Sequence, residues 1–191
     1  MNRVVGSMAA AVVLLFSFML IATVTSQVGA QAACTAAPKP KATINKQVEK
    51  VARAAHLTNT QVGNARTIVA IALQKKLPKR AAVIAVATSM QESRLRDLPY
   101  GDRDSLGLFQ QRPSSGWGSG DQVVDPTYAT KKFLAALQQV PNWPALPLTK
   151  AAQAVQRSAF PNAYAQWEPM AKKLVTAMLH RPAAKAGSCS R

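Results

Sequence analysis

Acidic residues are scarce in this chain of 191 residues, which has 8 of them against 24 lysines and arginines and a formal net charge of +16. This shortage leaves polyanions as the natural charged partners. A wall polymer, a nucleic acid and an anionic lipid surface all fit this description, and charge alone does not choose among them.

Signatures of metal and nucleotide binding are missing as well. The chain has no glycine-rich phosphate loop and no cysteine–histidine cluster with metal-ligand spacing. His56 and His180 stand alone, and a metal site needs several converging ligands, so we expect both at the surface or at helix ends. Basic residues are dispersed without interleaved aromatics, which argues against a groove for single-stranded nucleic acid. We expect no metal, no cofactor and no specific nucleic-acid partner.

Charge is absent between Arg3 and Lys39, and residues 8–24 form a hydrophobic run broken only by Ser17 and Thr23. With the small residues at 30–33, this pattern predicts a secretory signal peptide over residues 1–33. The alternative is a retained membrane anchor, because the run nearly reaches the length that spans a bilayer. We expect a secreted, cell-wall-associated protein, or a membrane-anchored one if the segment is kept.

Cysteine occurs only twice, as Cys34 and Cys189. In an exported protein the pair predicts a disulfide that joins the two ends of the mature chain. A lipidated Cys34 is the alternative, although Gln31 stands where a lipidation site normally has an aliphatic residue. Residues 34–43 are rich in proline and lysine, which predicts a linker. One helical domain over residues 44–191 would follow.

Period-two alternation is also missing beyond residue 43, so we expect an all-α fold, with room only for a short hairpin in the loop after Glu92. Apolar spacing and capping residues predict helices over 44–55, from Thr58 or Thr60, over 79–92, from Asp125, from Thr149 and from Pro161. The stretch 79–92 is apolar all round for two turns, which predicts a buried central helix. Residues 114–120 and 141–147 are expected to be loops.

Six of the eight acidic residues fall within residues 92–125. We expect Asp121 and Asp125 to serve as turn or cap residues. Glu92 differs, because it ends a buried helix, where apolar surroundings and the helix dipole both disfavour a negative charge. A carboxyl group that holds its proton near neutral pH suits a general acid for glycosidic bonds. The alternative is a half-exposed glutamate that faces Arg94 or Arg96.

Two short motifs resemble those of soluble lytic transglycosylases and goose-type lysozymes: Glu92-Ser93, and the Gly-Leu-Phe-Gln at 107–110. The block 91–118 also resembles a segment of short secreted actinobacterial proteins with a lysozyme-like domain. The resemblance implies a lysozyme-like α fold that cleaves the β-1,4 bond between N-acetylmuramic acid and N-acetylglucosamine. It further implies that Glu92 is the catalytic acid, that Ser93 supports the site and that Gln110 contacts the sugar.

The chain departs from this family in two places. Phe109 stands where methionine is usual. The family's third motif is Ala-Tyr-Asn, and the nearest candidate, Ala154-Val155-Gln156, lacks both the tyrosine and the asparagine. That departure leaves the positioning of the sugar open.

Other candidates come from the same acidic stretch. Asp102 and Asp104 are candidates for a second carboxylate, which hydrolysis by paired carboxylates needs and a transglycosylase does not. Gln111 could bind sugar hydroxyls or cap the loop, and Trp117 could stack on a sugar or fill the underside of the loop. Two further aromatic residues three positions apart on the last predicted helix, Tyr164 and Trp167, are expected in the core.

Three hypotheses follow from the sequence. The first is a secreted enzyme that cleaves peptidoglycan, acting as a monomer on glycan strands, with anionic wall polymers as further partners. The second is a non-catalytic wall-binding module on the same frame. The third is a cationic protein that acts on nucleic acid or membrane, the latter through its basic, amphipathic last helix.

Overall fold

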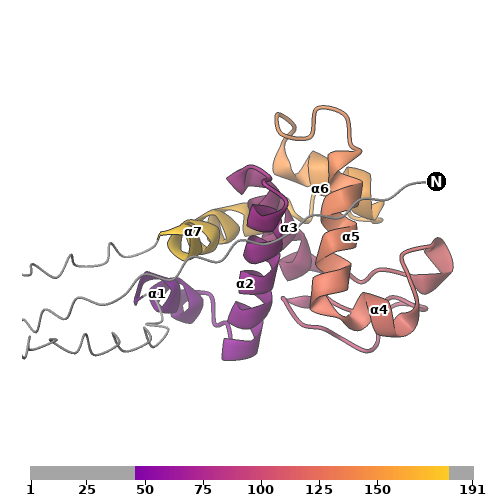
Figure 1. Ribbon diagram of the computed structural model, residues 1–191, viewed down its shortest axis with the longest axis horizontal. Coiled ribbons are helices and arrows are strands. Elements are labelled where there is room, and N and C mark those ends of the chain that lie inside the picture. Colours follow the sequence, from indigo (N-terminus) through magenta and orange to yellow (C-terminus); the bar gives the residue numbers. More distant parts are fainter. Residues whose placement is uncertain (1–45, 181–191) are drawn as a thin grey trace, which may run out of the picture. The chain divides into compact units, whose positions relative to one another are not determined.

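The structure is a computed structural model that describes residues 46–180, and this part of the chain folds into helices and turns without a β-strand. The predicted all-α fold is confirmed. The predicted signal segment, the linker and both cysteines lie outside the described residues. The elements (Figure 1) are α1 (Lys46–Ala54), α2 (Asn59–Gln74), α3 (Lys79–Ser93), η1 (Pro113–Ser115), α4 (Gly120–Val124), α5 (Pro126–Gln138), α6 (Leu148–Gln156), η2 (Ala165–Trp167) and α7 (Glu168–Leu179).

Helix α3 is the centre of this domain. All residues from 81 to 90 are buried, and the helix contacts α2, α5, α6, α7 and η2. Its buried alanines carry only a methyl group, so neighbouring helices can approach closely and bury the apolar surface of α3 on every side. The expected buried central helix is therefore confirmed. The alanines are Ala81, Ala82, Ala85 and Ala87.

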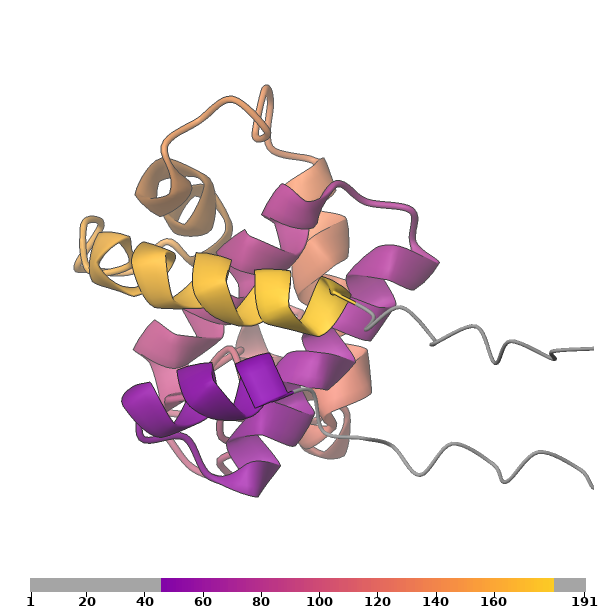
Figure 2. The same ribbon diagram turned by 90° about the vertical axis from the view of Figure 1, so that its left-hand side faces the viewer.

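Helix α7 covers one side of α3 and lies beside α1 (Figure 2). The amphipathic α1 buries Val48, Val51 and Ala52 and leaves its charged residues outside. This packing joins the first and last helices of the described domain.

Two predicted helix starts are confirmed. Thr58 opens α2 through a capping box: its hydroxyl accepts the Gln61 backbone N–H at 3.3 Å, and the Gln61 side chain accepts the Thr58 N–H at 2.7 Å. Asp125 caps α5 by accepting the Tyr128 N–H at 2.6 Å. Pro126 follows at the first helical position, where its missing N–H has no cost.

Two other predicted starts are wrong. Helix α6 begins at Leu148, and the hydroxyl of Thr149 does not cap it but donates to the Pro161 carbonyl at 2.6 Å. The last helix begins at Glu168 rather than at Pro161, because turns and the single turn of η2 intervene. The extended backbone of Pro147 starts α6 without a side-chain cap.

The structure also differs from the sequence prediction in the segment between α3 and α5. Residues 120–124, for which no helix is predicted, form α4, which Ser119 opens with a second capping box to Gln122. A helix of 5 residues is too short to show apolar periodicity. The short hairpin after Glu92 is reduced to one antiparallel bridge between Leu106 and Gln111, closed by two backbone hydrogen bonds of 3.0 Å.

Candidate functional site around Glu92

Glu92 lies in the last turn of α3, half-buried. The Tyr164 hydroxyl donates a hydrogen bond of 2.8 Å to its Oε1, and the side chain of Gln156 also hydrogen-bonds the carboxyl group. Burial raises the pKa of Glu92 above its ordinary value, and the hydrogen bonds from Gln156 and Tyr164 offset part of that rise. The site therefore favours a protonated carboxyl group and still supplies two partners for its anion.

The turn that follows Glu92 uses an uncommon backbone. Arg94 and Leu95 have positive φ angles of 58° and 59°, which cost non-glycine residues roughly 1–2 kcal/mol each. Side chains of α2 hold this turn: Gln61 Nε2 donates to the Arg94 carbonyl at 2.6 Å, and Asn64 Nδ2 donates to the Leu95 carbonyl at 2.9 Å. The Leu95 side chain is completely buried. Helix α3 thus ends at Ser93 in a turn that side chains of α2 hold in place.

Ser93 connects α3 to the following loop. Its hydroxyl lies 2.8 Å from the Leu108 carbonyl and 3.2 Å from the Ser89 carbonyl, and it accepts the Arg96 N–H at 3.1 Å. Only 2% of Ser93 is exposed. Ser93 is therefore buried at the end of α3, where it connects this helix to the loop that carries Leu108.

The loop itself is fixed by close packing. Gly107 has φ of 74°, and a Cβ added there would lie 1.9 Å from the Val123 carbonyl oxygen, so only glycine fits against α4. Two residues later, the ring of Phe109 stacks on Phe133 of α5 with centroids 4.5 Å apart. An aromatic pair of this kind stabilises by about 0.5–1.5 kcal/mol beyond its buried area. Phe109, the residue that departs from the usual methionine, anchors the loop to the core.

Asp104 has a structural partner. It accepts Nε of Arg112 at 2.7 Å and the Ser114 N–H at 2.8 Å. These two donors hold the pKa of Asp104 far below its usual range, so the group stays ionised and ties the loop to η1. Asp102 is exposed. Asp102 therefore lacks the burial of Glu92, and the charge of Asp104 is already paired with Arg112.

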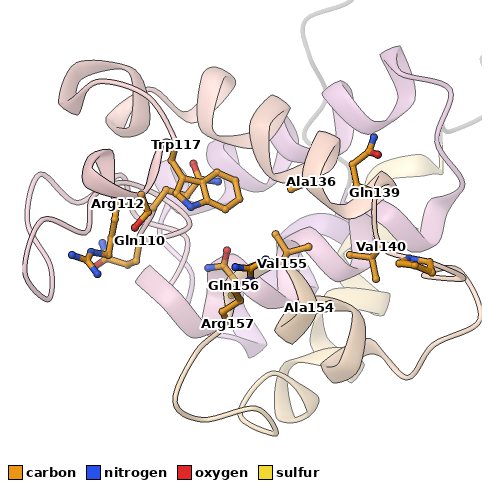
Figure 3. Close-up of a pocket in the computed structure, with 13 residues that line it drawn as sticks. Gln110, Arg112, Trp117, Ala136, Gln139, Val140, Ala154, Val155, Gln156 and Arg157 are labelled. Atoms are coloured by element: carbon orange, nitrogen blue, oxygen red, sulfur yellow. The ribbon is translucent and has the colours of Figure 1, made fainter.

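A cavity of about 810 Å³ lies beside this loop (Figure 3). Three of the predicted residues line it, namely Gln110, Gln111 and Trp117, while Ser93, Asp102 and Asp104 do not. Trp117 faces Gln156 across the opening (Figure 3). The other lining residues are Arg112, Ser115, Ala136, Gln139, Val140, Pro141, Ala154, Val155, Gln156 and Arg157.

Glu92 does not line this cavity itself, but its partner Gln156 does. The Gln156 amide Nε2 donates to the Phe109 carbonyl at 2.7 Å, and the Gln156 side chain also bonds Glu92. The carboxyl group, the loop and the cavity wall are therefore joined through one amide.

The two loop glutamines have different settings. Gln110 Nε2 reaches the carbonyls of Tyr100 and Gly107, each at 3.3 Å, and the residue has a φ of 47°. Gln111 is 3% exposed, and its amide nitrogen and oxygen have no hydrogen-bond partner among the described residues. Its backbone forms the bridge to Leu106, which holds the turn closed.

Two partners of Glu92 were missed in the sequence. From the sequence, Gln156 is only a poor match to the Ala-Tyr-Asn motif, and Tyr164 is expected in the core. Tyr164 is completely buried, as predicted, but its hydroxyl reaches the carboxyl group from 72 positions away. The dipeptide Ala163-Tyr164 matches the first two residues of the Ala-Tyr-Asn motif and was the available signal.

The described residues 46–180 contain no group of three or more histidine, cysteine or acidic side chains that could hold a metal ion. None of the helices in this range has the length and apolar character needed to cross a bilayer. In comparisons with known proteins, no protein-family model matches the chain, and no curated protein matches it.

Proposed function

We propose that the protein is a secreted enzyme that cleaves the β-1,4 bond between N-acetylmuramic acid and N-acetylglucosamine in peptidoglycan, with Glu92 as general acid. The observation that carries this proposal is the setting of Glu92: a half-buried carboxyl group with a raised pKa that is hydrogen-bonded by Tyr164 and by Gln156, a residue that lines a cavity. The resemblance of Glu92-Ser93 and of residues 107–110 to lytic transglycosylases supports the choice of substrate.

The cavity has the composition of a sugar site. The amides of Gln110 and Gln156 can bind sugar hydroxyl and acetamido groups, and Trp117 offers an aromatic face for a sugar ring. A glycan strand lying in it would pass Gln156 and meet Glu92. The basic chain and its predicted export support a wall location, with glycan strands and anionic wall polymers as partners.

The reaction begins with protonated Glu92. It donates its proton to the glycosidic oxygen while the bond from that oxygen to the sugar breaks, and the bonding electrons leave with the oxygen. Tyr164 and Gln156 then stabilise the carboxylate that remains. The carboxylate takes a proton from the attacking group, which is either water or the sugar's own C6 hydroxyl. The second route needs no second carboxylate, and it suits a site in which Asp104 is already paired.

The test compares the mature protein with its Glu92→Gln variant on purified peptidoglycan, with products read by mass spectrometry. We expect the variant to lose activity by about 100-fold or more, because a positioned general acid contributes that much. Products lighter by one water than the hydrolytic fragments would identify a transglycosylase, and reducing ends would identify a muramidase. Equal release of fragments by both proteins would overturn the proposal.

One observation favours a second function, a non-catalytic wall-binding module. The segment Ala154-Val155-Gln156 lacks the tyrosine and asparagine of the family's third motif. Tyr164 and Gln156 nevertheless supply two polar contacts to Glu92, so we place this alternative second. Salt-sensitive retention on wall material without any soluble fragments would support it.

A further inference from the structure

The segment that carries Tyr164 also holds two neighbours of Glu92. The Trp167 indole N–H donates to Oε1 of Gln91 at 2.8 Å. On the other side of Glu92 in the sequence, the guanidinium carbon of Arg94 lies 4.4 Å from the centroid of the Trp167 ring. Gln91, Glu92 and Arg94 therefore all contact residues 164–167. Arg94 follows the candidate acid by two residues in the sequence.

Arg94 is held in place at both ends. Its backbone has the positive φ of 58°, and its carbonyl accepts Gln61 Nε2 at 2.6 Å. Its side chain rests on an indole that Gln91 fixes, and Gln166 Nε2 donates to the same Gln91 oxygen at 3.1 Å. A stacked guanidinium of this kind loses little conformational freedom when a ligand binds.

The charge of Arg94 is not neutralised within residues 46–180. The ion pairs in that range are Arg53–Glu49, Arg112–Asp104 and Lys172–Glu168, so no carboxylate pairs with Arg94. The side chain is exposed. No hydrogen bond of the Arg94 guanidinium is recorded within residues 46–180, and a guanidinium can bind a carboxylate in a bidentate geometry.

A second hollow begins at the same tryptophan. It has a volume of about 640 Å³ and runs between α1 and α7, with Trp167, Met170 and Val51 among its apolar lining and with Lys50 and Lys173 as its charged residues. This hollow is separate from the cavity beside Gln156. An apolar hollow with two lysines, next to an unpaired arginine, suits an extended acidic peptide better than a neutral sugar.

We propose that Arg94, stacked on Trp167, binds a carboxylate of the short peptide attached to the glycan, with the rest of that peptide lying in the hollow between α1 and α7. This inference rests on the proposed function for the identity of the glycan. It divides the substrate between two surfaces: the sugars contact the cavity lined by Gln156, and the peptide contacts the α1–α7 hollow.

The test measures binding by calorimetry to the full mature chain carrying Glu92→Gln, so that no turnover occurs. The two ligands are a soluble muropeptide with an acidic peptide, and the same muropeptide with its peptide carboxylates amidated. We expect tighter binding of the acidic ligand. Arg94→Asn should weaken that binding about tenfold and abolish the preference, as expected for loss of one charge-assisted contact. Asparagine tolerates the positive φ, so the fold should be kept, and thermal unfolding checks this.

Lys76→Asn is the matched control. Lys76 is also exposed and has a positive φ of 55°, and it precedes the start of α3, about 20 Å of helix away from Glu92. The Lys76→Asn substitution removes one positive charge at the same kind of backbone position as Arg94→Asn. We expect the affinities for the acidic and the amidated muropeptide to stay unchanged. Arg94→Lys keeps the charge but not the planar fork, and should give intermediate binding.

Three results would overturn this inference: equal binding of both ligands by the parent protein, unchanged binding by Arg94→Asn, or an equal loss in Lys76→Asn. Cleavage is measured separately with Glu92 intact. If the protein prefers the acidic ligand through Arg94 but releases no fragments, the peptide-binding site stands and the proposed enzymatic activity is wrong. If it releases fragments without that preference, the enzymatic activity stands and the peptide-binding site is wrong.

Discussion

At the scale of single residues, the site is a balance between burial and hydrogen bonding at one carboxyl group. Burial raises the pKa of Glu92, and the donors Gln156 and Tyr164 lower it. A general acid must hold its proton until it donates it to the leaving oxygen and must be stable as an anion afterwards, so both effects would serve the proposed reaction. Removing either kind of interaction should shift the pH dependence in a known direction.

Tyr164→Phe removes one donor to the carboxylate while keeping the buried ring. The pKa of Glu92 should rise further, so the acid stays protonated to higher pH and the alkaline limb of the pH–rate profile moves upward. The rate at the plateau should fall about tenfold, because the carboxylate formed in the reaction loses a hydrogen bond. The measurement is kcat/KM against pH on soluble glycan. An alkaline limb that stays in place or moves to lower pH would contradict the assignment.

At the scale of elements, the loop over residues 100–111 is shaped by what it packs against. Its turn closes through the bridge between Leu106 and Gln111, Phe109 anchors it to α5, and Gly107 presses on α4. Contact with α4 therefore limits how closely the loop can pack at Gly107.

Gly107→Ala tests this packing. A methyl group there would meet the Val123 carbonyl and would also strain the positive φ, so we expect a loss of about 2 kcal/mol or more in the free energy of unfolding. Gly116→Ala is the control, because Gly116 has a similar φ of 81° but open space around it. It should cost only about 1 kcal/mol, from backbone strain alone. Equal costs in urea denaturation would mean that contact with α4 does not matter.

At the scale of the whole molecule, the all-α class and the buried position of α3 could be predicted, because both depend on local patterns of apolar and capping residues. The caps at Thr58 and Asp125 follow from the same local chemistry. The start of the last helix could not be predicted, because the backbone from Pro161 to Tyr164 is shaped by contacts such as the bond from Thr149 to Pro161.

The site itself could be predicted only in part. Glu92 was evident from its place at the end of an apolar helix, whereas its partners come from distant elements. Gln156 lies 47 positions from the loop carbonyl that it binds, and Trp167 lies 76 positions from Gln91. No periodicity or spacing encodes such pairs, since they depend on how α6 and η2 pack against α3. Tyr164 is also hard to recognise because only Ala163-Tyr164, and not the full Ala-Tyr-Asn motif, is present there.

Two carboxyl groups, Glu92 and Asp104, make the stability of the whole domain depend on pH. Because the folded-state pKa of Glu92 is raised, its protonated form favours the fold, and its contribution is complete below the unfolded pKa and is lost as pH rises through the folded pKa. Asp104 has the opposite sign, with a contribution present above its unfolded pKa and lost on acidification.

The variant Glu92→Gln isolates the first effect, since every other group cancels in the comparison. The free energy of unfolding of the parent protein, relative to that of the variant, should be highest in acid and should fall as pH rises toward neutrality. Urea denaturation of both proteins over a pH series measures the difference. Parallel stability curves would show that Glu92 titrates as it does in the unfolded chain.

The contacts of α3 with five other elements have a consequence for motion. A helix that packs against five other elements opens only when most of the domain opens. Glu92 is thus carried by a helix whose position depends on the packing of the whole domain. A ligand that reached Glu92 would meet a carboxyl group whose place is already fixed before binding.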